Sequence, residues 1–352
     1  MSHPDDRDSR CSRREFVRRL GAGAVALGAG ACLPGTEGDW PSCNTENDCT
    51  DPELDPPMPA SSRVVEVSSP GVADPVALVI EAGLVPAMVV AGLKALTGLD
   101  DEAAAWAAVL PGRTTGEIVG LKVNTLNERV PSSKPLVSSL VASLTGTVPA
   151  DELLVWDRHD DELITADLTE ATLGCRALGT IVESGSNQGP GYEERAACLS
   201  GKSICLSTLL TRETQHLINV SVMKSHSASG FTGCLKNNYG CFSNPGDFHD
   251  SCEQHIARLN ALPQITGPTR LHVMDALIGV AFGDTHKSED CAPGRILLSF
   301  DPVAIDQRGQ EIRDEMRVAR GAPVGAPGKY LPIAEALGLG TRSYELVTVV
   351  AG

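Results

Sequence analysis

The sequence predicts an α/β protein with a mostly parallel sheet and helices on both faces, arranged in one or two lobes. Apolar stretches with the two-residue period of strands alternate along the chain with stretches that have the period of helices. This alternation is typical of strand–helix–strand units, in which helices cover both faces of a parallel sheet. Several expected strands also end directly in charged residues, and ligands bind beyond the carboxyl ends of strands in such sheets.

Nine segments have the pattern of strands. The clearest runs from 217 to 223, where Ile218, Val220 and Val222 share one face. Four others are apolar runs that stop at a charged residue. The expected strands are 63–68, 117–123, 152–157, 179–184, 203–207, 217–223, 271–275, 295–300 and 345–350.

Helical patterns separate these strands. The stretch from 75 to 93 is nearly apolar and approaches the length of a membrane span, but Glu81 and Pro86 interrupt it. We therefore expect a buried core helix there. Asp301 precedes Pro302 and is expected to cap the N-terminus of the helix that follows. The expected helices are 75–97, 101–109, 133–144, 208–215, 231–241, 249–261, 302–318 and 330–337.

The first 31 residues resemble a twin-arginine export signal. Arg13 and Arg14 begin the matching motif, and a weakly hydrophobic Gly/Ala stretch follows that is too short to span a bilayer. We therefore expect the twin-arginine translocase to be a partner of this chain and its product to be exported to the cell envelope or periplasm.

Cleavage is expected directly before Cys32, because Ala29-Gly30-Ala31 satisfies the small-x-small rule. A cysteine at the first mature position also resembles a bacterial lipobox, although Ala29 stands where leucine is usual. A lipid anchor at Cys32 is favoured, and simple cleavage to a soluble secreted product remains open.

Residues 32–62 are predicted to be a disordered acidic tether before an α/β domain of residues 63–352. From 33 to 62 the chain is rich in Pro, Asp, Glu, Thr and Ser and has no Lys or Arg, so it has little apolar surface to bury. Cys43 and Cys49 lie in this stretch, and an oxidising destination predicts a local disulfide between them.

The net charge argues against nucleic acid as a partner. It is −16, and removing residues 1–31 takes away six arginines and four acids, which gives −18. An acidic surface also disfavours anionic membranes, which leaves the lipid anchor as the route to a membrane. The whole chain has eight lysines, and Lys122, Lys224 and Lys236 fall in two neighbouring motifs.

Polar residues at strand ends predict a site for a small anionic ligand, a carboxylate or a phosphate. Lys224 and His226 follow one strand with the same parity, and Lys122 and Asn124 end another. His226 is the candidate acid/base, because an imidazole titrates near neutral pH. The lysines would clamp the anion, with the further substrate-binding candidates Asn124, Asn237 and Asp275.

Structural roles compete with this interpretation. His226 could instead bond to the turn after its strand, and Lys224 or Lys236 could pair with Asp275 or Asp301. The sequence does not support a Ser-His-Asp triad, because it contains no G-x-S-x-G elbow. It also has no Walker or Rossmann glycine pattern, so a nucleotide site of either kind is not expected.

A second candidate site is the pattern H-x-x-C-x-x-H formed by His249, Cys252 and His255 on a predicted helix. Steps of three keep these residues within about 120° of arc, which permits a metal ion (nickel, zinc or iron) with further ligands from elsewhere. In an exported protein the cysteines are equally suited to disulfides, among Cys234, Cys241, Cys252 and Cys291.

Five segments together resemble the bacterial and archaeal family called domain of unknown function 362. They include K-x-H at Lys224, T-G-x-x-K-N at Thr232 and D-P-V-A-x-D at Asp301. The complete set is 117–124, 219–240, His249, 271–276 and 301–306. Many relatives carry a ferredoxin-like cysteine cluster, but this chain has no C-x-x-C spacing, so no iron–sulfur cluster is expected.

A shorter stretch, from His226 to Lys236, is similar in spacing to a motif of the nickel-pincer lactate racemase family. The resemblance implies that His226 is the acid/base catalyst and Lys236 holds the cofactor. It also implies a later nickel ligand, either His249 or His255.

These observations favour an exported enzyme that acts on a small anionic substrate by proton transfer or isomerisation, with or without a metal ion. The alternative is a non-catalytic envelope lipoprotein that binds or delivers an anionic ligand or a metal.

Overall fold

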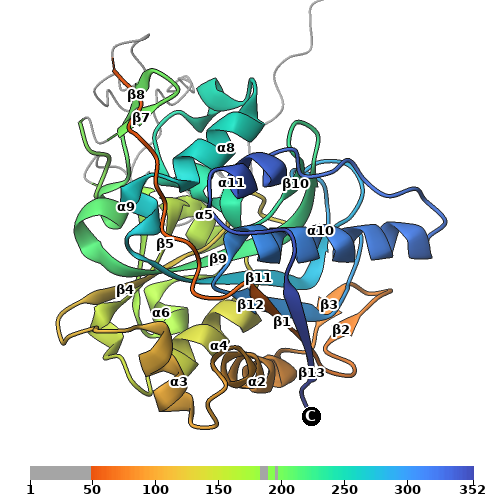
Figure 1. The fold of residues 1–352 in the computed structure, drawn as a ribbon. Coiled ribbons are helices and arrows are strands. Elements are labelled where there is room, and N and C mark those ends of the chain that lie inside the picture. Colours follow the sequence, from red (N-terminus) through yellow and green to blue (C-terminus); the bar gives the residue numbers. More distant parts are fainter. Residues whose placement is uncertain (1–48, 183–188, 195–196) are drawn as a thin grey trace, which may run out of the picture.

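A computed structural model describes residues 49–182, 189–194 and 197–352 (Figure 1). Within these residues nine strands form one sheet of order β13-β1-β12-β11-β9-β4-β5-β6, and β10 pairs with β9. The strands are β1 (Arg63–Ser68), β4 (Ile118–Lys122), β5 (Leu153–His159), β6 (Arg176–Ile181), β9 (Thr214–His226), β10 (Gly230–Thr232), β11 (Thr269–Val280), β12 (Arg295–Ser299) and β13 (Glu345–Val350).

The sheet is mostly parallel, which confirms the predicted α/β class. Strands β11, β9, β4, β5 and β6 run parallel to one another. Strand β12 is antiparallel to both of its neighbours, β11 and β1, and β13 completes the sheet parallel to β1. The strands form one continuous sheet rather than two lobes.

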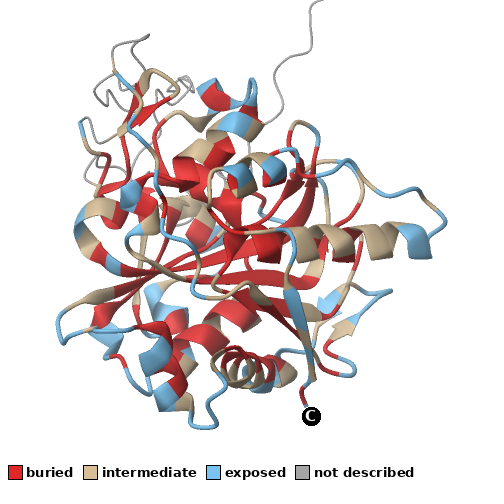
Figure 2. Cartoon of the chain, viewed as in Figure 1, coloured by how far each residue is buried: buried red, intermediate tan, exposed pale blue. Residues whose placement is uncertain are grey.

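Helices cover both faces of the sheet (Figure 1). Successive residues of β5 show why: Leu153 and Val155 belong to the hydrophobic core under α2 and α4, and Leu154 and Trp156 to the core on the other face. Figure 2 shows the sheet buried between the two layers. The helices are α2 (Val85–Thr97), α3 (Glu102–Val109), α4 (Lys134–Leu144), α5 (Asp160–Thr165), α6 (Glu170–Leu173), α7 (Cys234–Asn237), α8 (Cys252–Asn260), α9 (Pro263–Thr266), α10 (Pro302–Ala319) and α11 (Leu331–Ala336).

Three predicted elements show the clearest differences from the structure. The expected helix 75–97 begins only at Val85, because Pro86 suits the first turn of a helix and not its interior. The residues before it form a small hairpin, β2 (Ala73–Asp74) and β3 (Val79–Ile80). The expected helix 231–241 is divided between β10 and the single turn α7.

The third difference is the predicted strand 203–207. Only β8 (Lys202–Ile204) forms there, and it pairs with β7 (Ala197–Leu199) in a hairpin outside the main sheet. Single turns of other helix types complete the described chain: η1 (Ala82–Leu84), η2 (Ala150–Glu152), η3 (Leu209–Glu213), η4 (Asn238–Cys241) and η5 (Pro245–Phe248).

Among the described residues, no single helix combines the length and apolar composition needed to cross a membrane. Helices η1–α2 and α3 meet that criterion only as a pair, across a bend of 61°. Residues such as Met88 and Leu93 of α2 are fully buried against the sheet, as expected for a core helix.

Residues 49–62, which the composition predicts to be disordered, lie against the domain. Cys49 forms a disulfide with Cys198, 149 residues away. Asp51 forms a salt bridge with Arg258, and Ser62 donates a hydrogen bond to Asp301. The predicted local disulfide of Cys49 is therefore wrong, because the strap of residues 49–62 brings Cys49 to the β7–β8 hairpin. Cys43 lies outside the described residues.

Candidate functional site

Four of the five charged strand ends meet at one edge of the sheet. Lys122 ends β4, Asp157 lies near the end of β5, Lys224 near the end of β9, and Asp275 within β11. The order β11-β9-β4-β5 makes these strands parallel neighbours, so their carboxyl ends share an edge. Asp301 is the exception: it follows β12, whose antiparallel direction places it at the opposite edge.

Lys122 is fully engaged by the protein. Its Nζ forms a buried salt bridge with Asp157 at 2.7 Å and donates to the carbonyls of Val123 at 2.7 Å and Asn237 at 3.2 Å. Burial alone would raise the pKa of Asp157, but Lys122 and the N–H groups of Thr125 and Arg158 hold it below its usual value. An ammonium has three donors, so Lys122 has none left for a substrate.

Three asparagines connect the strand ends. Asn237 donates from its amide to Asn219 at 2.7 Å and accepts at Oδ1 from Asn124 at 3.2 Å. Asn124 in turn accepts at Oδ1 from Lys224 at 2.7 Å. The predicted substrate residues Asn124 and Asn237 therefore hold the lysines in place, and every bond named here is buried or nearly so.

Lys224 is buried without a carboxylate at salt-bridge distance among the described residues. Its side chain is 1% exposed, and Asn124 is its hydrogen-bond partner. Burial lowers its pKa to about 7, against the opposing attraction of Asp157 and Asp275. Burial also disfavours the charged form of Asp275 and so raises its pKa. The carboxylate of Asp275 accepts hydrogen bonds from the N–H groups of Ser133 and Leu277. The predicted buried ion pair between Lys224 and Asp275 is therefore absent.

His226 ends β9 and is oriented by the turn that follows. Its Nδ1 accepts hydrogen bonds from the backbone N–H groups of Ala228 at 3.0 Å and Ser229 at 3.3 Å. Burial and the neighbouring Lys236 lower the pKa of the ring to about 4, so it is neutral at pH 7. Because Nδ1 accepts, the proton of the neutral ring lies on Nε2. His226 thus presents a hydrogen-bond donor at Nε2, while its Nδ1 is occupied by the turn.

A tight turn makes this arrangement possible. Gly230 joins β9 to β10 with a φ of +84°, and a Cβ there would lie 1.9 Å from the carbonyl oxygen of Pro327. The turn therefore requires glycine at this position.

Lys236 lies beside His226 at the outer side of the same edge. It is partly buried, its Nζ lies 4.7 Å from the ring centroid of Tyr239, and burial lowers its pKa to about 8. No carboxylate of the described residues reaches it at salt-bridge distance. His249 completes the group, stacked on His226 with ring centroids 6.0 Å apart. We call Lys224, His226 and Lys236 the basic cluster.

The predicted metal site does not assemble. His249 precedes α8, which begins at Cys252, so the three residues are not spaced along one helix. His249 bonds through Nδ1 to the carbonyl of Pro245, and His255 through Nδ1 to that of Phe248. Among the described residues, no group of three or more His, Cys, Asp or Glu side chains is arranged to hold a metal ion.

The predicted disulfides among four cysteines do not form either. All four are buried and free, and they come from different elements: Cys234, Cys241, Cys252 and Cys291.

The two aspartates of D-P-V-A-x-D are structural. Asp301 accepts from the N–H groups of Val303 and Ala304, which confirms the predicted N-cap of α10. Asp306 accepts from the N–H groups of Cys234 at 2.5 Å and Leu235 at 3.1 Å. It therefore fixes the start of α7, the turn that carries Lys236.

Comparison with known proteins places the chain in a family. The family model described as "Domain of unknown function (DUF362)" matches residues 119–311, which include every strand of the charged edge. The chain belongs to this family. No curated protein matches this DUF362 chain.

Among solved structures, the DUF362 chain is similar to a crystal structure of a Thermotoga maritima protein from the Northeast Structural Genomics Consortium. The TM-score is 0.34 and the sequence identity 10%, over 67% of this chain and 58% of that protein. The DUF362 chain thus spans less than two thirds of the length of that protein.

Sequence reasoning missed Asn219 and Tyr239 as parts of this edge. Asn219 is a polar residue inside an apolar strand, and that interruption was the available signal. Tyr239 follows Lys236 by three residues, which is the spacing of neighbours on a helical turn. Arg13, Arg14 and Cys32 lie outside the described residues.

Proposed function

We propose that this DUF362 protein is an enzyme that acts on a small anionic substrate by proton transfer at the basic cluster. The observation that carries the proposal is the presence of two lysines, Lys224 and Lys236, that have no carboxylate partner among the described residues at the carboxyl edge of the sheet. Buried charges in proteins are paired, neutralised or matched by a ligand. In a chain of net charge −16, an unpaired basic cluster is suited to an anion.

The side chains suggest distinct roles. Lys236, at the outer side, would bind the carboxylate or phosphate of the substrate. His226 would donate its Nε2 proton toward an oxygen that gains charge during the reaction. Lys224 lies two residues before His226 on β9, about 7 Å away along the strand.

Lys224 is the candidate base, because a pKa of about 7 leaves much of its population neutral at physiological pH. It would take a proton from the carbon next to the carboxylate and return it, on the same face, to that carbon or to a neighbouring atom. We therefore move the base from His226, the residue expected from sequence, to Lys224.

Deuterium exchange tests the proposal. The protein is incubated in D2O with 2-hydroxy acids, 2-oxo acids and amino acids, and proton NMR follows loss of the Cα–H signals. We expect exchange for one class, with a rate that rises through pH about 7 as Lys224 loses its proton. Lys224→Met should abolish exchange, and Lys134→Met, which changes an exposed lysine of α4, should leave it unchanged.

The non-catalytic alternative makes a different prediction. A carrier would bind one of these acids without exchange, and His226→Gln would alter affinity alone. Loss of exchange with retained binding in His226→Gln would support the enzyme.

Export through the twin-arginine pathway, with lipidation or cleavage at Cys32, is part of the same proposal. The disulfide of Cys49 with Cys198 is compatible with an oxidising destination. The intact mass of the mature product tests it: a diacylated cysteine at position 32 would identify a lipoprotein, and an unmodified one a secreted product. A mature chain that retains residues 1–31 would contradict export.

A further inference from the structure

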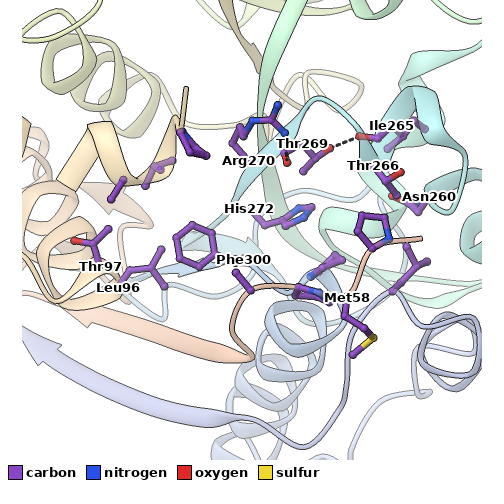
Figure 3. Close-up of a pocket in the computed structure, with 18 residues that line it drawn as sticks. Met58, Leu96, Thr97, Asn260, Ile265, Thr266, Thr269, Arg270, His272 and Phe300 are labelled. Carbon is purple, nitrogen blue, oxygen red and sulfur yellow. Dashed lines mark hydrogen bonds between the residues drawn. The ribbon is translucent and has the colours of Figure 1, made fainter. Parts of the chain in front are cut away.

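A pocket lies at the opposite end of β11 from the basic cluster. It has a volume of about 400 Å³, within the range of small-molecule sites. Figure 3 shows it between the strap, the ends of α2 and α3, and the first residues of β11. The register pairs His272 with Asn219, and Asn219 precedes Lys224 by five residues. The two sites are therefore about 16 Å apart along the sheet.

The walls of this pocket are largely apolar. The apolar lining residues include Leu96, Val109, Phe300 and Leu339, together with Met58 of the strap. Met58 is 65% exposed, which is unusual for a large apolar side chain and places it where the pocket meets solvent. None of the residues that line the pocket is acidic.

His272 is a buried polar side chain directed into this apolar space (Figure 3). It is 5% exposed, and its Nδ1 receives a hydrogen bond from the Asn219 amide at 3.4 Å. The proton of the neutral ring therefore lies on Nε2. Among the described residues nothing accepts a hydrogen bond from Nε2. Ligand pockets are usually apolar and contain a few polar groups that fix the orientation of the ligand, and a hydrogen-bond donor such as Nε2 suits that role.

Arg270 supplies the positive charge of the lining residues. It is the extra residue of a β-bulge, because the register shifts between Thr269 and Leu271. Arg270 and His272 both line the pocket. Its Nε bonds to His216 and its Nη1 to the carbonyls of Gly267 and Thr269.

Arg270 still has N–H groups that can donate hydrogen bonds to a ligand. Within the described part of the chain, no carboxylate lies at salt-bridge distance from it, and its Nη2 has no hydrogen-bond partner. A single guanidinium in a pocket without acids matches a ligand with a single negative charge, and guanidinium groups bind carboxylates with favourable geometry.

We propose that this pocket binds a small organic acid, with its apolar body against Leu96, Phe300 and Met58 and its carboxylate held by Arg270 and His272. The site is independent of the basic cluster, so it stands whether or not the proposed proton transfer is found.

Isothermal titration calorimetry on the mature chain tests the proposal with three probes: octanoate, 1-octanol and acetate. Octanoate should bind. 1-Octanol should bind at least about ten-fold more weakly than octanoate, because it lacks the charge. Acetate should not bind at this pocket, because it lacks the apolar body. Arg270→Gln should weaken octanoate binding about ten-fold or more and change 1-octanol binding by less than two-fold.

Two further variants separate ligand recognition from folding. Met58→Trp adds bulk at an exposed position and should block octanoate and 1-octanol alike without disturbing the core. Arg320→Gln, at an exposed arginine directly after α10 that does not line the pocket, should leave both affinities unchanged.

Three results would overturn the proposal. These are the absence of octanoate binding by folded protein at millimolar concentration, equal affinity for octanoate and 1-octanol, and unchanged octanoate affinity in folded Arg270→Gln.

Discussion

Lys224 is a buried lysine with no carboxylate partner among the described residues. A buried ammonium without a counter-charge is unfavourable, and here one neutral amide oxygen is its hydrogen-bond partner. The period-two pattern of β9 predicted that Lys224 and His226 lie on one face at a strand end. Sequence pattern could not show that Lys122 forms a salt bridge with Asp157, because Asp157 lies on a different strand, 35 residues later.

Changing Lys224 to methionine should alter how stability depends on pH. The folded-state pKa is about 7 and the ordinary value is 10.5. Between these values the unfolded chain keeps a proton that the folded chain lacks, so raising the pH stabilises the folded wild type. Denaturant unfolding of both proteins at pH 7 and pH 10 measures this. Wild type should gain stability relative to Lys224→Met over this interval, and a constant difference would contradict the assigned pKa.

The imidazole of His226 should remain neutral well into the acidic range. Its pKa is about 4 in the folded protein against an ordinary 6.5. The unfolded chain therefore takes up a proton between pH 6.5 and 4, and wild type should lose stability relative to His226→Gln as the pH falls through that window. NMR titration of the ring nitrogens checks both points, and a midpoint near 6.5 would refute them. Those spectra should also show the proton on Nε2 at pH 7.

At the scale of elements, α7 is a single turn that depends on contacts from outside itself. Helices this short are not stable by propensity, and Asp306 supplies acceptors for the first N–H groups of α7. Sequence periodicity predicted one helix from 231 to 241, because apolar and polar residues in that stretch are spaced as in a helix. The pairing of Phe231 with Ser225 and Thr232 with Lys224 instead draws the first residues into the sheet.

Gly233 precedes α7 and allows Asp306 to approach. A Cβ at Gly233 would lie 2.2 Å from the Asp306 carboxylate, so Gly233→Ala should lower the free energy of unfolding by about 1–3 kcal/mol. Chemical denaturation measures the loss. Gly246→Ala is the matched control, since nothing lies within 4 Å of a Cβ there. Equal stability of the two variants would show that Asp306 moves away at little cost.

Another lesson at this scale concerns the start of α8. The pattern H-x-x-C-x-x-H suits a metal site only if all three residues are on one helix. Ser251 adopts a left-handed conformation at the N-cap of α8, which separates His249 from the helix. A sequence pattern does not reveal a backbone reversal of this kind.

For the molecule as a whole, alternation of strands and helices predicted the fold class, but not the order of the strands. Strand order depends on long-range pairing, and the antiparallel direction of β12 places Asp301 at the opposite edge of the sheet from the other charged strand ends. The local disulfide was predicted from spacing alone, whereas its partner lies 149 residues away.

The disulfide of Cys49 with Cys198 should contribute strongly to stability, because it closes a long loop. Replacing both cysteines with serine should lower the free energy of unfolding by about 2–5 kcal/mol. Denaturation with and without a reducing agent checks this. The reductant should destabilise the wild type by more than it destabilises the double variant, because the double variant has already lost this bond. A wild type insensitive to reductant while the bond is demonstrably reduced would contradict the expectation.

The position of β1 in the sheet has a consequence for the chain while it is being synthesised. β1 lies between β12 and β13, so its backbone pairs only with strands that follow it by more than 220 residues. During synthesis, the buried valines of β1 leave the ribosome long before their partners exist. A nascent chain therefore displays an unpaired apolar strand until β12 and β13 emerge, and during that interval it is a natural substrate for chaperones.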